Sequence, residues 1–429
     1  MKHSHHYSVV PFVFLTFVYF LVGFLTTING QFQGPLKIAF LSDAGEMKNT
    51  FTTLISFFFF LGYLLNSSVA GRWIDNHGYK STMLRALVCM IVGLLLYDLA
   101  AYIVVNHSDV RIHYKGGTIP WGFVVFLFGS FLMGTSAAIL QVVINPYVSA
   151  YDLPGTRPAQ RLNIVTAVNS FGTTIAPFFL TMVVFSGVSL DDITASQLLI
   201  PFLIIAGIIA LVTAFSSKIS LPDLSHTHAD SNQNLSRSIW SFRHLTLGVI
   251  AIFFYVGTEV SIGSNINLHA MELHLGSGIP SLLATLYWGG FLVGRFVSTF
   301  FRNFNPRKIL IVTTIIASVL IIISIYTENL WFLAAVGLFH SVMWSCIFTL
   351  STRGLREYTS KASGVFMMGV FGGAVFPVAQ GFLSDLLCSW QYTWSIALIC
   401  EIVMLLYGLY GYNIKDKWCL DNLRKITNM

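Results

Sequence analysis

Charged residues are scarce throughout this chain. Aspartate, glutamate, lysine and arginine together make up 10% of its 429 residues, whereas hydrophobic residues make up 55%. Soluble globular proteins carry about 25% charged residues. Because the deficit extends over the whole length, we expect most of the protein surface to face lipid rather than water.

Cysteines are few, and alternating strand patterns are missing. The chain has five cysteines, mostly within apolar segments: Cys89, Cys346, Cys388, Cys400 and Cys419. Their spacing matches no metal site and indicates no disulfide framework. The absence of strand-like alternation excludes a membrane β-barrel and leaves helices as the spanning elements. We also find no nucleophile–base pair, metal cluster or phosphate-binding loop, so we expect neither an enzyme nor a cofactor.

Long apolar runs are plentiful. A spanning helix needs about 20 mostly apolar residues. Twelve segments meet that requirement: 8–34, 49–72, 81–105, 120–150, 159–186, 197–217, 244–272, 279–302, 307–326, 329–352, 362–387 and 391–413. The first is too long for a signal peptide and lacks a small-residue cleavage site. The sequence therefore predicts an all-α membrane protein with twelve transmembrane helices.

The basic residues predict the orientation of these helices. If both termini lie in the cytoplasm, the outer side receives few of the 24 lysines and arginines: Lys37, Lys48, Arg111 and Lys115. This bias follows the positive-inside rule. The net charge of +6 therefore reflects topology, and no basic stripe with interleaved aromatics indicates nucleic-acid binding. We expect a multi-pass protein of a bacterial inner (plasma) membrane.

A single polar segment divides the chain into two halves. We expect an N-terminal six-helix half over 1–217, a cytoplasmic linker over 218–243 and a C-terminal six-helix half over 244–429. Two six-helix halves joined by a linker resemble the major facilitator fold, whose halves are related by pseudo-symmetry about a central cavity.

The stretch "GRWIDNHGYK", residues 71–80, carries a recognisable loop motif. Gly71, Asp75, Gly78 and Lys80 resemble the G-x-x-x-D-x-x-G-x-[RK] loop of the major facilitator superfamily. Glycine permits a tight turn, and an aspartate can cap a helix or pair with a cation. The resemblance implies a gating role, with Arg295 at the matching place in the second half. The alternative is an ordinary charged loop.

Two polar stripes lie on neighbouring predicted helices. Gln141 and Asn145 are four residues apart and share a helix face, and Pro146 can open that helix locally. Thr166 and Asn169 lie on one face of the next helix. Such stripes can hold adjacent helices together, or they can line a cavity for a polyhydroxylated ligand. The spacing alone does not decide between these two interpretations.

Five segments resemble the fucose–galactose–glucose:proton symporter family, in the order of its fourth, fifth, seventh, eighth and eleventh helices. They are "LQVVINPYVSA", "RLNIVTAVNSFGTTIAP", "FFYVGTEVSIGS", "YWGGFLVGRF" and "SGVFMMGVFGGAVFPVAQGFLSD". The resemblance covers most of the chain and implies sugar transport by alternating access. It also implies that Thr166 and Asn169 occupy polar positions of the family.

The chain departs from the proton-coupled fucose permeases at two positions. Their helix-1 acid falls on Gly30, directly after Asn29, and their helix-4 acid falls on Gln141. Glutamine at the second position also occurs in the glucose/galactose branch of the family. Because both titratable groups are absent, the resemblance does not imply proton coupling through the first helix.

Few acids remain at membrane depth: Asp98, Glu259, Asp385 and Glu401. An ionisable residue at such a depth is a candidate functional residue. Glu259 is the best candidate, because it lies in a family-like motif beside other polar residues. It can bind a proton or sodium, or accept a hydrogen bond from a sugar hydroxyl. The alternative is a buried acid paired with arginine or a backbone group, and Glu401 is expected to face neighbouring helices or lipid.

The sequence thus predicts a secondary active transporter that imports a monosaccharide with a proton or sodium ion. The predicted substrate-binding residues are Asn29, Gln141, Asn145, Thr166, Asn169, Glu259, Asn265, Trp344 and Gln380, with Glu259 also coupling the ion. Trp344 would stack on the apolar face of the sugar. The alternatives are an uncoupled sugar facilitator and a membrane sugar sensor. We expect a monomer in the lipid bilayer.

Overall fold

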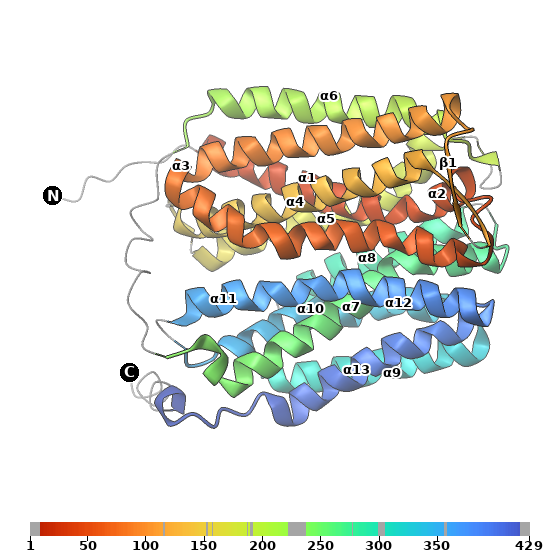
Figure 1. The fold of residues 1–429 in the computed structure, drawn as a ribbon. Helices are drawn as coiled ribbons and strands as arrows, with labels where there is room; N and C mark the ends of the chain where they lie inside the picture. Colours follow the sequence, from red (N-terminus) through yellow and green to blue (C-terminus); the bar gives the residue numbers. More distant parts are fainter. Residues whose placement is uncertain are drawn as a thin grey trace. The chain divides into compact units, whose positions relative to one another are not determined.

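The computed structural model describes residues 9–114, 116–151, 153–156, 158–186, 188, 192–221, 237–276, 278–298, 305–355 and 358–420. Long helices dominate this part of the chain (Figure 1). Eleven helices in the described ranges are long and apolar enough to cross a membrane. The protein is therefore an all-α, multi-pass integral membrane protein.

The chain forms two compact units, residues 1–229 and 230–429. The division falls within the predicted linker, of which residues 222–236 lie outside the described part. The first unit contains α1 (Val9–Gln31), α2 (Gln33–Ala39), η1 (Gly45–Met47), α3 (Lys48–Asn106), β1 (Arg111–Tyr114), β2 (Gly117–Pro120), α4 (Trp121–Ala150), α5 (Pro158–Phe179), η2 (Leu180–Val184) and α6 (Ser196–Lys218).

The second unit repeats the all-helical pattern. It contains η6 (Ile239–Ser241), α7 (Arg243–Glu272), α8 (Ile279–Ser298), α9 (Pro306–Thr327), α10 (Trp331–Thr352), α11 (Thr359–Met368), η8 (Gly369–Phe371), α12 (Gly372–Leu387), η9 (Gln391–Trp394), α13 (Ser395–Leu406) and η10 (Tyr407–Gly411). The predicted span 279–302 corresponds to α8. This helix is not among the eleven apolar helices. Its described part has 20 residues and carries Arg295 in the last turn.

The second and third predicted spans form the two arms of α3, which run antiparallel (Figure 1). The expected loop over 71–80 is wrong in extent, because the chain stays helical except at Gly78, where φ is 75° and ψ is 169°. This backbone conformation is readily adopted by glycine. A single glycine therefore reverses the chain between the two arms.

The same helix pairs recur in each unit. In the first unit α3 packs along α4 and α6, and α1 along α5; in the second, α10 packs along α8, α7 along α12, and α9 along α13. The close approaches also match: a Cβ on Gly134 would lie 1.8 Å from Phe59 O, and a Cβ on Gly337 would lie 2.0 Å from Tyr287 O. These contacts indicate an internal structural repeat.

The outer faces of the helices are apolar. On α6, Ile200, Ile204 and Leu211 are 68%, 57% and 72% exposed. Large exposed apolar surfaces are unusual for soluble monomers. Such a surface suits a lipid environment.

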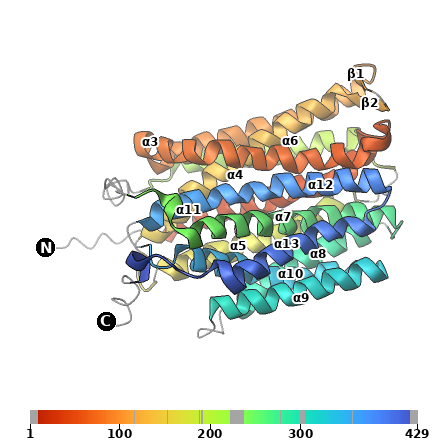
Figure 2. The ribbon, with the colours of Figure 1, turned by 60° about the horizontal axis from the view of Figure 1, so that its bottom comes forward.

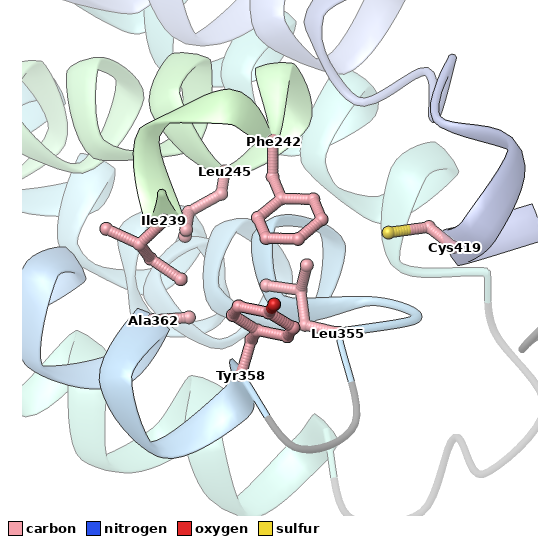
Figure 3. Packing of buried hydrophobic residues seen from close by; sticks show 7 residues of the cluster. All are labelled: Ile239, Phe242, Leu245, Leu355, Tyr358, Ala362 and Cys419. Carbon is pink, nitrogen blue, oxygen red and sulfur yellow. The ribbon is translucent and has the colours of Figure 1, made fainter. Parts of the chain in front are cut away.

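Each unit also has a local feature that the apolar runs did not predict. In the first, β1 and β2 pair as a short antiparallel hairpin (Figure 2), and Arg111 forms an ion pair of 2.7 Å with Asp43. In the second, seven buried residues form the Phe242 cluster (Figure 3): Ile239, Phe242, Leu245, Leu355, Tyr358, Ala362 and Cys419. The cluster joins the start of α7 to the segment that follows η10.

Candidate functional site

Asn29 lies at a junction of three helices in the first unit. Its Oδ1 accepts hydrogen bonds from Tyr97 on α3 and, at 2.9 Å, from Ser130 on α4. The Asn29 side chain is only 3% exposed. In this conformation Asn29, which was predicted to bind the sugar, therefore holds α1, α3 and α4 together.

Gln141 and Asn145 are half-buried on α4. Gln141 Nε2 donates to Tyr63 OH at 2.9 Å. Asn145 Oδ1 is buried and has no hydrogen-bond partner among the described residues. A buried polar atom without a partner is costly, so Asn145 retains an acceptor that a ligand hydroxyl can satisfy.

Arg161 binds the C-terminal end of α4 and is 3% exposed. Its guanidinium donates to the carbonyls of Val148 at 3.0 Å, Ser149 at 2.8 Å and Thr156 at 3.0 Å. Pro146 lies inside α4, but the helix continues to Ala150. The arginine thus satisfies carbonyls that a helix end leaves unpaired.

The observed hydrogen bonds of the polar stripe on α5 reach α1. Among the described residues, they do not reach the polar stripe on α4. Asn169 Nδ2 donates to Tyr19 O at 2.8 Å, and a Cβ on Gly23 would lie 2.6 Å from that same Nδ2. Thr166 Oγ1 donates to Leu162 O of its own helix at 2.9 Å. Both side chains are half-buried. Asn169 therefore holds α1 and α5 together. This role matches the first of the two interpretations of the polar stripes.

Glu259 is half-buried on α7. Its carboxyl lies near Tyr255 and within electrostatic reach of Arg295. Its backbone carbonyl accepts a hydrogen bond of 3.1 Å from Tyr287 OH on α8. The structure thus brings Glu259 and Arg295, predicted separately, into one electrostatic environment. The surroundings also include two tyrosine hydroxyls.

Asn265 and Gln380 are brought together, but they bond to each other. Asn265 Nδ2 donates to Gln380 Oε1 at 2.9 Å, and Gln380 Nε2 donates to Thr393 Oγ1 at 3.0 Å. Asn265 and Gln380 are 0% and 1% exposed. The chain of bonds links α7, α12 and η9.

Trp344 is half-buried on α10 within a group of aromatic rings. Its ring stacks on Phe348 with centroids 5.3 Å apart and meets Phe366 edge-on at 5.7 Å. Offset-stacked and edge-to-face pairs stabilise aromatic packing. These neighbours fix the orientation of the indole.

The structure reveals a buried pair that the sequence interpretation missed. His340 Nε2 and Glu401 Oε1 lie 2.7 Å apart, and both side chains are 0% exposed. Glu401 therefore faces helix α10, which is the first of the two expected environments, and not lipid. A histidine and an acid at membrane depth were the available signal, but their 61-residue separation concealed the pairing.

The four residues of the predicted gating motif have different environments. Gly78 forms the reversal within α3, whereas a Cβ on Gly71 would meet nothing within 4 Å. Asp75 is exposed. Lys80 Nζ donates to Ser217 O at 2.8 Å, near the end of α6. Arg295, the predicted counterpart in the second half, lies 5.5 Å from the Phe291 ring.

Comparisons with known proteins agree with this architecture. Residues 15–377 match the family model of the Major Facilitator Superfamily. The chain is 30% identical over 406 residues to the glucose/galactose transporter of Brucella abortus, covering 92% of this chain and 93% of the relative. It is 32% identical over 419 residues to the putative glucose/galactose transporter of Helicobacter pylori, covering 94% and 97%. The L-fucose-proton symporter of Escherichia coli is 27% identical over 433 residues, covering 94% and 93%.

Solved structures share the fold. The outward conformation of FucP gives a TM-score of 0.63 at 23% identity, covering 94% of this chain and 99% of the other. The inward open conformation of the E. coli xylose transporter XylE gives 0.69 at 11% identity, covering 98% and 100%. The family match extends over most of the chain, and the helical architecture agrees with it. This chain belongs to the Major Facilitator Superfamily.

Proposed function

We propose that the protein imports a monosaccharide across a bacterial inner membrane by alternating access, coupled to a proton or sodium ion. The observation that carries this proposal is the similarity, over more than nine-tenths of the chain, to proteins named glucose/galactose transporters. The polar side chains at membrane depth are compatible with a hydroxyl-rich ligand, because amides both donate and accept hydrogen bonds. Both termini lie in the cytoplasm, and the protein acts as a monomer.

In the first half, Gln141 and Asn145 are the leading sugar ligands. Both are half-buried, and Asn145 Oδ1 is a buried acceptor with no partner among the described residues. Thr166 on α5 is also half-buried, and we include it among the sugar ligands of this half. Asn29 and Asn169 reach a sugar only after exchanging the bonds that they now make to neighbouring helices.

In the second half, Glu259 and Trp344 are the leading ligands. Glu259 offers a carboxyl near Tyr255 and Arg295, and Trp344 offers an aromatic face for the apolar side of a sugar ring. Asn265 and Gln380 bind the sugar only after their mutual hydrogen bond has broken. Binding is expected to be weak, because tight binding of the sugar in one conformation would slow its release.

Transport by the purified protein in proteoliposomes tests the proposal. Labelled D-glucose, D-galactose and L-fucose are supplied one at a time, with and without gradients of protons or sodium. Uphill accumulation driven by either gradient supports the proposal. Counterflow without accumulation under any gradient would instead identify an uncoupled facilitator, and sugar binding without movement would identify a sensor.

A further inference from the structure

His340 on α10 and Glu401 on α13 form a buried polar pair outside the proposed sugar ligands. The Nε2–Oε1 distance is 2.7 Å, and neither side chain is exposed. Water therefore does not screen the pair in this conformation. The hydrogen bonds around the pair indicate which of its atoms carry protons.

Tyr287 OH lies close to both a main-chain carbonyl and His340. We assign its single hydroxyl proton to Glu259 O, which can only accept and lies 3.1 Å away. Tyr287 Oη is then left to accept from His340 Nδ1, which lies 2.9 Å away. A tyrosine hydroxyl has only one proton to donate, so this arrangement places a hydrogen on Nδ1.

The short contact between His340 Nε2 and Glu401 Oε1 then requires one shared proton. Either the imidazole is protonated and faces a carboxylate, or a neutral imidazole accepts from a carboxylic acid. Both arrangements leave the pair with zero net charge. A neutral pair is the form that a buried, water-free site favours.

Removal of the shared proton would leave a buried carboxylate uncompensated. The other oxygen, Glu401 Oε2, is buried and has no hydrogen-bond partner among the described residues. An unpaired buried charge costs several kcal/mol. The proton is therefore retained while the site is closed to water and released when water reaches it.

The surroundings connect the pair to Glu259. Tyr255 OH donates to His340 O at 2.9 Å and lies within reach of the Glu259 carboxyl. The other titratable groups facing this region from adjoining helices are Tyr287 and Arg295 of α8 and Cys400 of α13. Helix α9 has no titratable residue between Lys308 and Tyr326.

The other titratable side chains described on the adjoining elements are exposed or hydrogen-bonded elsewhere. Lys361, Tyr392 and Tyr410 are exposed. Tyr407 is hydrogen-bonded to Ser351 at 2.9 Å. The charged neighbourhood of the pair is therefore the one formed with Glu259 and Arg295.

We propose that the His340–Glu401 pair binds the coupling proton, with Tyr287 positioning the imidazole. This inference rests on the proposed sugar transport and selects the proton over sodium as the coupling ion. One proton enters the pair from the outer solution and leaves to the cytoplasm in each cycle. No covalent bond of the sugar changes.

The test uses the full chain in proteoliposomes that contain a pH-sensitive dye. Addition of labelled D-galactose, D-glucose or L-fucose should acidify the lumen as the transported sugar enters. For one proton per sugar, an inward proton gradient should drive about tenfold accumulation per pH unit. Glu401→Gln and His340→Asn should retain counterflow but lose acidification and pH-driven accumulation. The control Ser351→Ala removes a buried hydrogen bond between α10 and η10 and should accumulate sugar as the wild type does.

The outcomes separate this inference from the proposed function. If the wild type moves no sugar, both fail. If the wild type accumulates sugar and Glu401→Gln does so equally under a proton gradient, only the pair is excluded. Accumulation by a sodium gradient without lumen acidification also overturns the proton site and leaves sugar transport standing.

A third variant keeps the test informative if the other two do not fold. Tyr287→Phe keeps the ring and removes the hydroxyl that orients His340 Nδ1. It should shift the pH at which accumulation is half-maximal. An unchanged pH profile in this variant overturns the proposal.

Discussion

Arg237 and Asp416 are joined by two hydrogen bonds between the segment before η6 and the segment after η10. The Nη1–Oδ1 distance is 3.3 Å and the Nη2–Oδ2 distance is 2.7 Å. The guanidinium carbon of Arg237 also lies 5.2 Å from the Phe242 ring. The ion pair thus stabilises the Phe242 cluster at its edge.

The Arg237–Asp416 pair should make thermal stability depend on acid pH. Arg237 holds the pKa of the Asp416 carboxyl below its usual value. Because the folded pKa is below the unfolded value, the stabilisation is present above about pH 4 and is lost as the pH falls through the folded pKa. Asp416→Asn should therefore lower Tm at pH 7, and the difference from wild type should shrink at pH 3. Intrinsic fluorescence on heating measures both, with exposed Asp109→Asn as the control.

Gly78→Ala should destabilise the reversal of α3. Its φ of 75° and ψ of 169° lie in a region that is almost confined to glycine, where a non-glycine residue costs about 1–3 kcal/mol. Gly71→Ala introduces the same methyl group where nothing lies within 4 Å, so its Tm should stay equal or rise. Equal losses of Tm in the two variants would contradict this assignment.

Two cysteines should differ in their reaction with a membrane-impermeant maleimide. Cys388 is exposed at the end of α12, and the predicted orientation places it outside. Cys419 is buried in the Phe242 cluster, and burial raises the pKa of its thiol to about 11. Intact cells should label at Cys388, whereas permeabilised cells should still label Cys419 slowly. Cys388→Ser is the control; persistent labelling of intact cells by that variant would contradict the orientation.

Gln141→Ala should weaken sugar binding. Loss of a hydrogen bond to a buried polar group costs about 1–3 kcal/mol, which corresponds to a Kd increase of roughly 5- to 150-fold. Equilibrium binding of labelled sugar measures this change. Asn106→Ala removes an exposed amide at the end of α3 and should bind as the wild type does.

Glu259→Gln should separate sugar exchange from accumulation. Glutamine preserves the shape of the side chain but removes the charge that faces Arg295 beside the His340–Glu401 pair, so gradient-driven accumulation should fall at least tenfold while counterflow continues. Glu272→Gln is a matched control on the same helix, because its Oε1 can still accept the bond from Trp390 N. Unchanged accumulation in Glu259→Gln would remove Glu259 from the coupling mechanism.

The sequence predicts the helices well because lipid burial demands long apolar runs. Helix α9 (Pro306–Thr327) begins and ends within one residue of the predicted span 307–326. Backbone details were less accessible: Gly78 supplies a turn of one residue, and β1–β2 is too short to produce a clear alternating pattern.

The candidate site was predictable residue by residue but not as a set of contacts. Asn265 and Gln380 were identified individually, yet their mutual hydrogen bond spans 115 residues. The His340–Glu401 contact depends likewise on how α10 and α13 pack. The spacing of polar residues along one helix does not indicate which distant side chain will form a hydrogen bond with each of them.

Arg161 has a consequence for the electrical character of the ligand. Its Nε, Nη1 and Nη2 atoms all donate to main-chain carbonyls, so its cation is committed to the end of α4. A carboxylated sugar approaching Gln141 and Asn145 would therefore find the Arg161 guanidinium already bonded to the main chain. An arginine that stabilises a helix end in this way does not serve as the counter-ion of a sugar acid.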